Sequence, residues 1–165
     1  MARNVAVTLL PGTRGRLRTP ELRRIARRVL DSESVATDVE VEVVLADDAT
    51  VRDLNRLYRG KDEETDVLSF AAHEGEAFLD SPDEAPSLGE VIVSVSFVER
   101  QVANIAGRGV AITIEGQLAH LLVHGLLHLI GLDHERGETE EAEMREKEEA
   151  LLEVLGYAGT YVHGH

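Results

Sequence analysis

Three histidines in the second half of the chain have the side-chain type and the spacing of metal ligands. His124 and His128 are four residues apart, so in an α-helix both imidazoles leave the same face. Gly131 can adopt the left-handed conformation that ends a helix and turns the chain, which would bring His134 round as a third nitrogen ligand. Three protein ligands leave one position of a tetrahedral Zn²⁺ open, as in catalytic zinc sites. The segment therefore predicts one catalytic zinc ion held by these three histidines.

The same spacing occurs in the metzincin proteases, H-E-x-x-H-x-x-G-x-x-H, with one difference. Gly125 stands where those enzymes carry the glutamate that acts as general base. The pattern thus predicts the metal ligands of a hydrolase without the base of a peptidase. His120 lies one helical turn before His124, and we interpret it as a residue that orients a ligand or packs beside it. The alternative is that His120 replaces His134 as a ligand.

Composition indicates one folded domain of 165 residues. The chain has no cysteine, which excludes disulfides, cysteine-rich zinc fingers and thiolate catalysis. The N-terminus lacks a signal-peptide pattern and the longest apolar stretch is short for a membrane span, so we expect a cytoplasmic protein with no membrane segment. The formal net charge is −14, yet residues 1–30 contain eight arginines and one glutamate. Solvated helix faces are the simpler interpretation of that segment, and a phosphate-facing surface is the alternative.

The periodicity of apolar residues divides the chain into strands and helices around the histidine segment. Alternating or apolar stretches predict strands over residues 4–10, 39–45, 65–70 and 88–95. Capping residues and apolar stripes predict helices that begin at Thr19 and at Asp47 or Asp48, and others over 96–106, 112–130 and 139–155. Residues 73–88 are acidic and irregular, which is typical of a loop. We expect an α+β fold in a single domain over residues 1–165, with about four strands in a mixed sheet, about five helices, and a central buried histidine helix.

Three stretches taken together resemble the YbeY family. The segment N-R-L-Y-R-G (55–60) with T-D-V-L-S-F (65–70) is similar to the family's first signature, and L-G-E-V-I-V (88–93) is similar to its central strand. The histidine segment with L-G-Y (155–157) is similar to its C-terminal half. Three positions depart from residues that are common in the family, namely Ala71 for proline, Glu90 for aspartate and Leu132 for tyrosine. None of the three is a proposed ligand.

The resemblance implies a zinc-dependent endoribonuclease that cuts single-stranded RNA. It implies action in ribosomal RNA processing, including maturation of the 16S 3′ end, and in ribosome quality control. The implied partners are ribosomal RNA precursor, the small ribosomal subunit and its assembly factors. The implied site has one Zn²⁺ on His124, His128 and His134, with Arg59 as the catalytic residue. Arg59 suits phosphodiester chemistry because a guanidinium stays charged and can hold two phosphate oxygens.

Several alternatives stay open at this point. The attacking group is either a zinc-activated water or the RNA 2′-hydroxyl, and Asp133 either orients a ligand or accepts a proton. A metzincin-like metallopeptidase would need a base from elsewhere in the chain. A ribosome-binding assembly factor with a structural zinc would need a fourth protein ligand, for which His120, Asp133 and His73 are candidates. We interpret His163 and His165 as part of a frayed tail that could capture stray metal.

Overall fold

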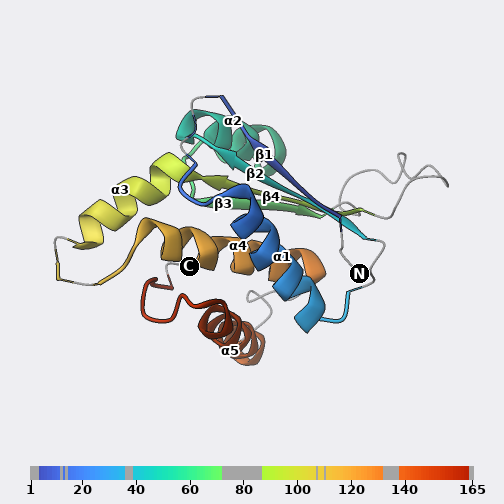
Figure 1. The fold of residues 1–165 in the computed structure, drawn as a ribbon. Helices are drawn as coiled ribbons and strands as arrows, with labels where there is room; N and C mark the ends of the chain where they lie inside the picture. The colour runs from blue at the N-terminus through green and yellow to red at the C-terminus, as the bar shows by residue number, and fades with distance from the viewer. Residues whose placement is uncertain are drawn as a thin grey trace.

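A computed structural model describes residues 4–11, 13, 15–35, 39–71, 87–106, 108–109, 111–131 and 138–163. Its strands are β1 (Asn4–Leu9), β2 (Glu40–Ala46), β3 (Val67–Ala71) and β4 (Ser87–Ser94). Its helices are α1 (Thr19–Ser32), α2 (Asp48–Arg59), α3 (Val95–Ala106), α4 (Ile114–Ile130) and α5 (Glu138–Leu155). The described part of the chain thus forms one four-stranded sheet with five helices, which confirms the predicted α+β fold (Figure 1).

The sheet is mixed, with the strand order β1-β2-β4-β3. Strands β1, β2 and β4 run parallel, and β3 pairs antiparallel with β4 at the edge of the sheet. Because side chains alternate across a strand, Val41, Val43 and Leu45 enter the larger core while Val44 and Ala46 enter a smaller core on the opposite face. Both faces of the sheet are therefore covered.

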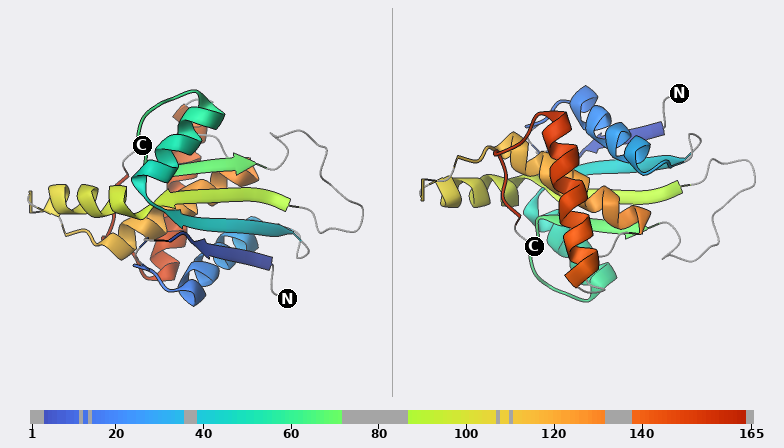
Figure 2. Two further views of the ribbon diagram at one scale, coloured as in Figure 1. Left: turned by 90° about the horizontal axis from the view of Figure 1, so that it is seen from above. Right: turned by 90° about the horizontal axis from the view of Figure 1, so that it is seen from below.

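The histidine helix α4 lies in the middle of the molecule. In Figures 1 and 2, α2 covers one face of the sheet, α1 and α4 cover the other, and α5 packs on the outer side of α4. This position explains why α4 is apolar almost all round, since residues 116–127 are all buried. The buried histidine helix was predicted from the sequence. No helix in the described ranges is both long and apolar enough to cross a membrane.

Local sequence signals fix the ends of the helices that carry the site. The side chain of Asp47 caps α2 by accepting a hydrogen bond from the Thr50 N–H at 2.8 Å, and Gly60 ends that helix at φ 70°. Gly131 ends α4 at φ 106°, as its predicted turn requires. Helix α1 begins at Thr19, as predicted, but the predicted capping role of Thr19 is wrong. The Leu22 N–H donates to the Arg18 carbonyl at 3.0 Å, so Arg18 is the cap and Thr19 already lies in the first turn.

Candidate metal centre and active site

Two of the three predicted metal ligands face each other on α4. His124 and His128 lie one helical turn apart, and their Nε2 atoms are 3.1 Å from each other. Two imidazoles bound to one zinc ion at tetrahedral angles would have their nitrogens about 3.3 Å apart. The pair therefore has the separation that a shared ion requires. His134, the third predicted ligand, lies outside the described residues, and so do Asp133 and His73.

A glutamate from α5 orients the first of these histidines. The Nδ1 of His124 lies 2.7 Å from Oε2 of Glu148, a residue that is only 3% exposed. Burial alone would raise the pKa of Glu148, but hydrogen bonds and charge from His120 and His124 outweigh it and hold the pKa well below the usual range. Glu148 is therefore a carboxylate that only accepts hydrogen bonds. When His124 is neutral, it therefore carries its proton on Nδ1 and presents the lone pair of Nε2 toward His128.

His120 is placed on the far side of the same carboxylate. Its Nε2 lies 3.0 Å from Oε1 of Glu148 and 3.2 Å from Nδ1 of His163. The ring of Tyr161 stacks on His120 with centroids 5.0 Å apart. His120 thus contacts the residue that orients His124. The interpretation of His163 as part of a frayed tail is wrong, because its ring contacts both α4 and α5. His165 lies outside the described residues.

Arg59 is the last residue of α2, and it lines the same cavity as the histidine pair of α4. Its guanidinium donates to the Ser69 carbonyl on the edge strand β3 and lies over the Phe70 ring, 4.9 Å from the centroid. A cavity of about 490 Å³ then brings Arg59, His124 and His128 together. The other residues that line this cavity are Asn55, Lys61, Glu63, Glu64, Thr65, Val67, Leu68 and Ser69. Residues about 65 positions apart in sequence therefore share one concave site.

Gly125 is a packing position between α4 and the sheet. A Cβ built on Gly125 would lie 2.7 Å from Cγ1 of Val91 and 3.0 Å from Oγ of Ser69. The Ser69 hydroxyl also donates to the Gly125 carbonyl at 3.1 Å, which ties α4 to β3. A glutamate at this position would have to push the strands away. The absence of the metzincin base is thus built into the packing of the helix.

The main residue that the sequence analysis missed is Glu148. The buried stripe of α5 contains Met144, Leu151, Leu152 and Leu155, and Glu148 lies within that stripe. A lone carboxylate among apolar positions at helical spacing is the signal that indicates a buried polar partner. The identity of that partner depends on how α5 docks against α4, which the spacing alone does not give.

Chemically, the arrangement combines two imidazoles at the spacing of metal ligands with the guanidinium of Arg59. The described residues also include one group of three metal-ligating side chains, His120, Glu148 and His163, whose ligand atoms lie within 4.8 Å of one another. Two imidazoles and a guanidinium around one cavity suit a hydrolytic reaction on an anionic substrate.

Comparison with known proteins gives consistent results. A family model described as "Endoribonuclease YbeY" matches residues 13–156. An endoribonuclease YbeY from Roseiflexus castenholzii is 44% identical over 133 residues, which are 81% of this chain and 80% of that protein. Another from Roseiflexus sp. strain RS-1 is 41% identical over 155 residues, 93% of this chain and 94% of the relative.

A solved structure gives the same result for the fold. The solution structure of TM1509 from Thermotoga maritima is similar with a TM-score of 0.58 and 26% sequence identity. The match covers 92% of this chain and 88% of that one. The two proteins are therefore similar in fold over most of both chains.

Proposed function

The chain belongs to the YbeY family, and from this we propose that it is a metal-dependent endoribonuclease that acts in ribosomal RNA processing. One observation carries the proposal: the imidazole pair, of which His124 contacts a buried carboxylate, shares a cavity with an arginine. We infer a single catalytic domain over residues 1–165, acting in the cytoplasm on single-stranded precursor RNA, including the 16S 3′ end. The inferred partners are the small ribosomal subunit and its assembly factors.

The donor set of the α4 pair fits zinc. Nitrogen ligands from neutral histidines are typical of Zn²⁺ sites, and a carboxylate behind a ligating histidine is the usual support for it. We propose that His124, His128 and His134 hold one zinc ion. A zinc ion held there would supply Lewis-acid chemistry and would lower the pKa of a water molecule to about 7.

The protein's own side chains have distinct tasks in this reaction. Glu148 fixes the ring of His124, so the ligand nitrogen does not need to reorient during turnover. Arg59 holds the scissile phosphate and stabilises the negative charge that develops on its oxygens. A guanidinium has five donors, so Arg59 can contact the Ser69 carbonyl and a phosphate together. Lys61 lines the same cavity and adds a second positive charge.

The two alternative functions are less well supported. The packing of Gly125 against Val91 leaves no place for the peptidase glutamate. A structural zinc would need a fourth protein ligand, and His120 is held by Glu148 and His163 on the other side of the carboxylate. Both observations favour the endoribonuclease.

A charge reversal at Arg59 tests the proposed phosphate contact. We expect Arg59→Glu to reduce cleavage of single-stranded RNA at least 100-fold, the loss typical of removing a transition-state donor. Arg56→Glu is the matched control, because Arg56 is exposed in the same last turn of α2 and does not line the cavity. Zinc content and thermal unfolding should match the unmutated protein in both variants. Equal losses of activity in the two variants would show that the effect is general electrostatics.

A further inference from the structure

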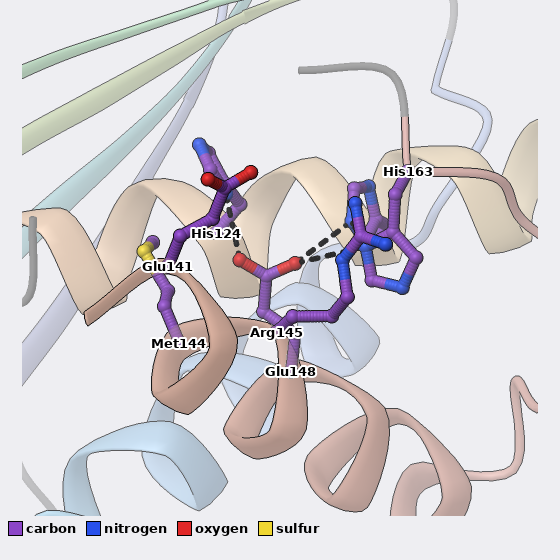
Figure 3. Close-up of a pocket in the computed structure, with 7 residues that line it drawn as sticks. His124, Glu141, Met144, Arg145, Glu148 and His163 are labelled. Carbon is purple, nitrogen blue, oxygen red and sulfur yellow. Dashed lines mark hydrogen bonds and ion pairs between the residues drawn. The ribbon is translucent and has the colours of Figure 1, made fainter. Parts of the chain in front are cut away.

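A second set of ligand atoms converges on the far side of Glu148 from His124. Three atoms form a triangle: Nε2 of His120, Oε1 of Glu148 and Nδ1 of His163. The first and second are 3.0 Å apart, the first and third 3.2 Å, and the second and third 3.4 Å. They come from α4, from α5 and from the segment after α5. In Figure 3 the carboxylate of Glu148 lies between His124 on one side and His163 on the other.

When both imidazoles are neutral, the protons available within this triangle do not satisfy all three atoms. The Nε2 of His163 lies 3.2 Å from the Glu149 carboxylate, so that nitrogen carries the proton of the neutral ring and Nδ1 keeps its lone pair. Glu148 Oε1 has only lone pairs. One N–H on His120 can serve either atom, but Glu148 Oε1 and His163 Nδ1 then remain two acceptors 3.4 Å apart. A cation at the centre would satisfy all three ligand atoms together.

The surroundings have room and charge for a small cation. A cavity of about 20 Å³ adjoins the triangle, which is enough for about one water-sized sphere. Glu141 and Met144 also line it, together with Arg145, the one positive side chain among its lining residues. Glu141, Glu148 and the neighbouring Glu149 outweigh that charge. Two imidazole nitrogens with one carboxylate oxygen are a usual ligand set for zinc.

We propose that His120, Glu148 and His163 form a second binding site for a divalent transition metal such as Zn²⁺. This site uses none of the ligands proposed for the catalytic ion, and it takes the other oxygen of Glu148. An ion bound to Oε1 withdraws charge from the carboxylate that holds His124 through Oε2. Occupancy of the second site therefore weakens the support of the first, a consequence that rests on the proposed function.

Zinc stoichiometry measured by calorimetric titration of the chelator-stripped full-length chain tests the proposal. The unmutated protein should bind two zinc ions, and His163→Ala and His128→Ala should each bind one. His165→Ala is the matched control for capture by the tail and should still bind two. Because His163 contacts α4 and α5, thermal unfolding of the stripped His163→Ala variant is measured as well, and a single cooperative transition shows that the variant is folded.

Two results would overturn the second site. One is a single zinc ion in the unmutated protein that is retained by His163→Ala and lost by His128→Ala, which leaves the proposed function intact. The other is a second ion lost in His165→Ala but kept in His163→Ala, which assigns it to the tail. If His163→Ala alone loses an ion and His128→Ala loses none, the second site stands and the proposed catalytic ligands fail.

Discussion

At the scale of single residues, the site depends on how one carboxylate is shared. Glu148 contacts His124 through one oxygen and His120 through the other, so it connects the proposed ligand to the residues that contact the C-terminal segment. The ligand pair was predictable from spacing because helix geometry alone places His124 and His128 on one face. Glu148 and His163 were not, because their roles arise only when distant segments dock. The role of Arg59 was implied by the family resemblance. Its position near the histidines, beside the edge strand β3, depends on the tertiary fold and could not be predicted from local sequence.

The carboxylate of Glu148 should set the affinity of the proposed zinc ion. Glu148→Gln keeps the shape of the side chain but removes the charge that supports His124, so we expect zinc affinity to fall by roughly 10–100-fold. Competition with a chromophoric chelator measures this change. Glu146→Gln, an exposed site on the same helix, is the control and should bind zinc normally. Unchanged affinity in Glu148→Gln would mean that the contact to His124 is only structural.

At the scale of elements, each helix and strand was predictable to within a few residues from periodicity and capping. Alternation identified β2, and Asp47 with Gly60 marked the ends of α2. The order of strands in the sheet was not predictable in this way, because it depends on non-local pairing. That order has an electrostatic cost, since it places Glu42 of β2 directly beside Glu90 of β4. Burial raises the pKa of Glu90, and the neighbouring Glu42 raises it further.

Removing one charge of this pair should stabilise the fold. The folded pKa of Glu90 lies above its unfolded value, so its ionised form costs stability once the pH exceeds that folded pKa. We expect Glu90→Gln to raise the free energy of unfolding at pH 7 by roughly 0.2–1 kcal/mol, the range for like charges on neighbouring strands. The gain should shrink as the pH falls through the raised pKa. Urea unfolding at several pH values measures it.

A matched variant distinguishes the repulsion between Glu42 and Glu90 from the effect of the protein's overall negative charge. Glu40→Gln also removes one negative charge from the sheet, on β2 next to β4, but Glu40 is exposed and lies beside Asn4 and Ser87. It should leave the free energy of unfolding at pH 7 nearly unchanged. Equal stabilisation by the two variants would attribute the effect to the overall charge of −14 instead of the Glu42–Glu90 pair.

At the scale of the whole molecule, an acidic protein must bind an anionic substrate through a small area. The arginines near the N-terminus are partly engaged within the protein: Arg16 pairs with Glu99, and Arg24 pairs with Glu21 and the Leu155 carbonyl. These contacts favour the interpretation of that segment as a structural surface. Two positive side chains, Arg59 and Lys61, line the large cavity, together with two negative ones, Glu63 and Glu64. We therefore expect the two positive side chains of this cavity to contact about two phosphates of the RNA.

The salt dependence of RNA binding should therefore be shallow. Two neutralised phosphates on a single strand give a slope of about −1.4 in log K against log salt concentration. Fluorescence anisotropy with a labelled single-stranded RNA and the His128→Ala variant, which should not cleave, would measure binding without turnover. A slope steeper than about −4 would indicate that a wider basic surface, such as the arginine-rich segment, takes part.

The most direct measurement is RNA cleavage by chelator-stripped protein before and after zinc is returned. The stripped protein should leave a single-stranded RNA intact, and zinc should restore cleavage to the unmutated protein but not to His124→Ala. Cleavage that survives complete removal of metal, or that zinc restores equally in His124→Ala, would contradict a catalytic ion held by the α4 histidines.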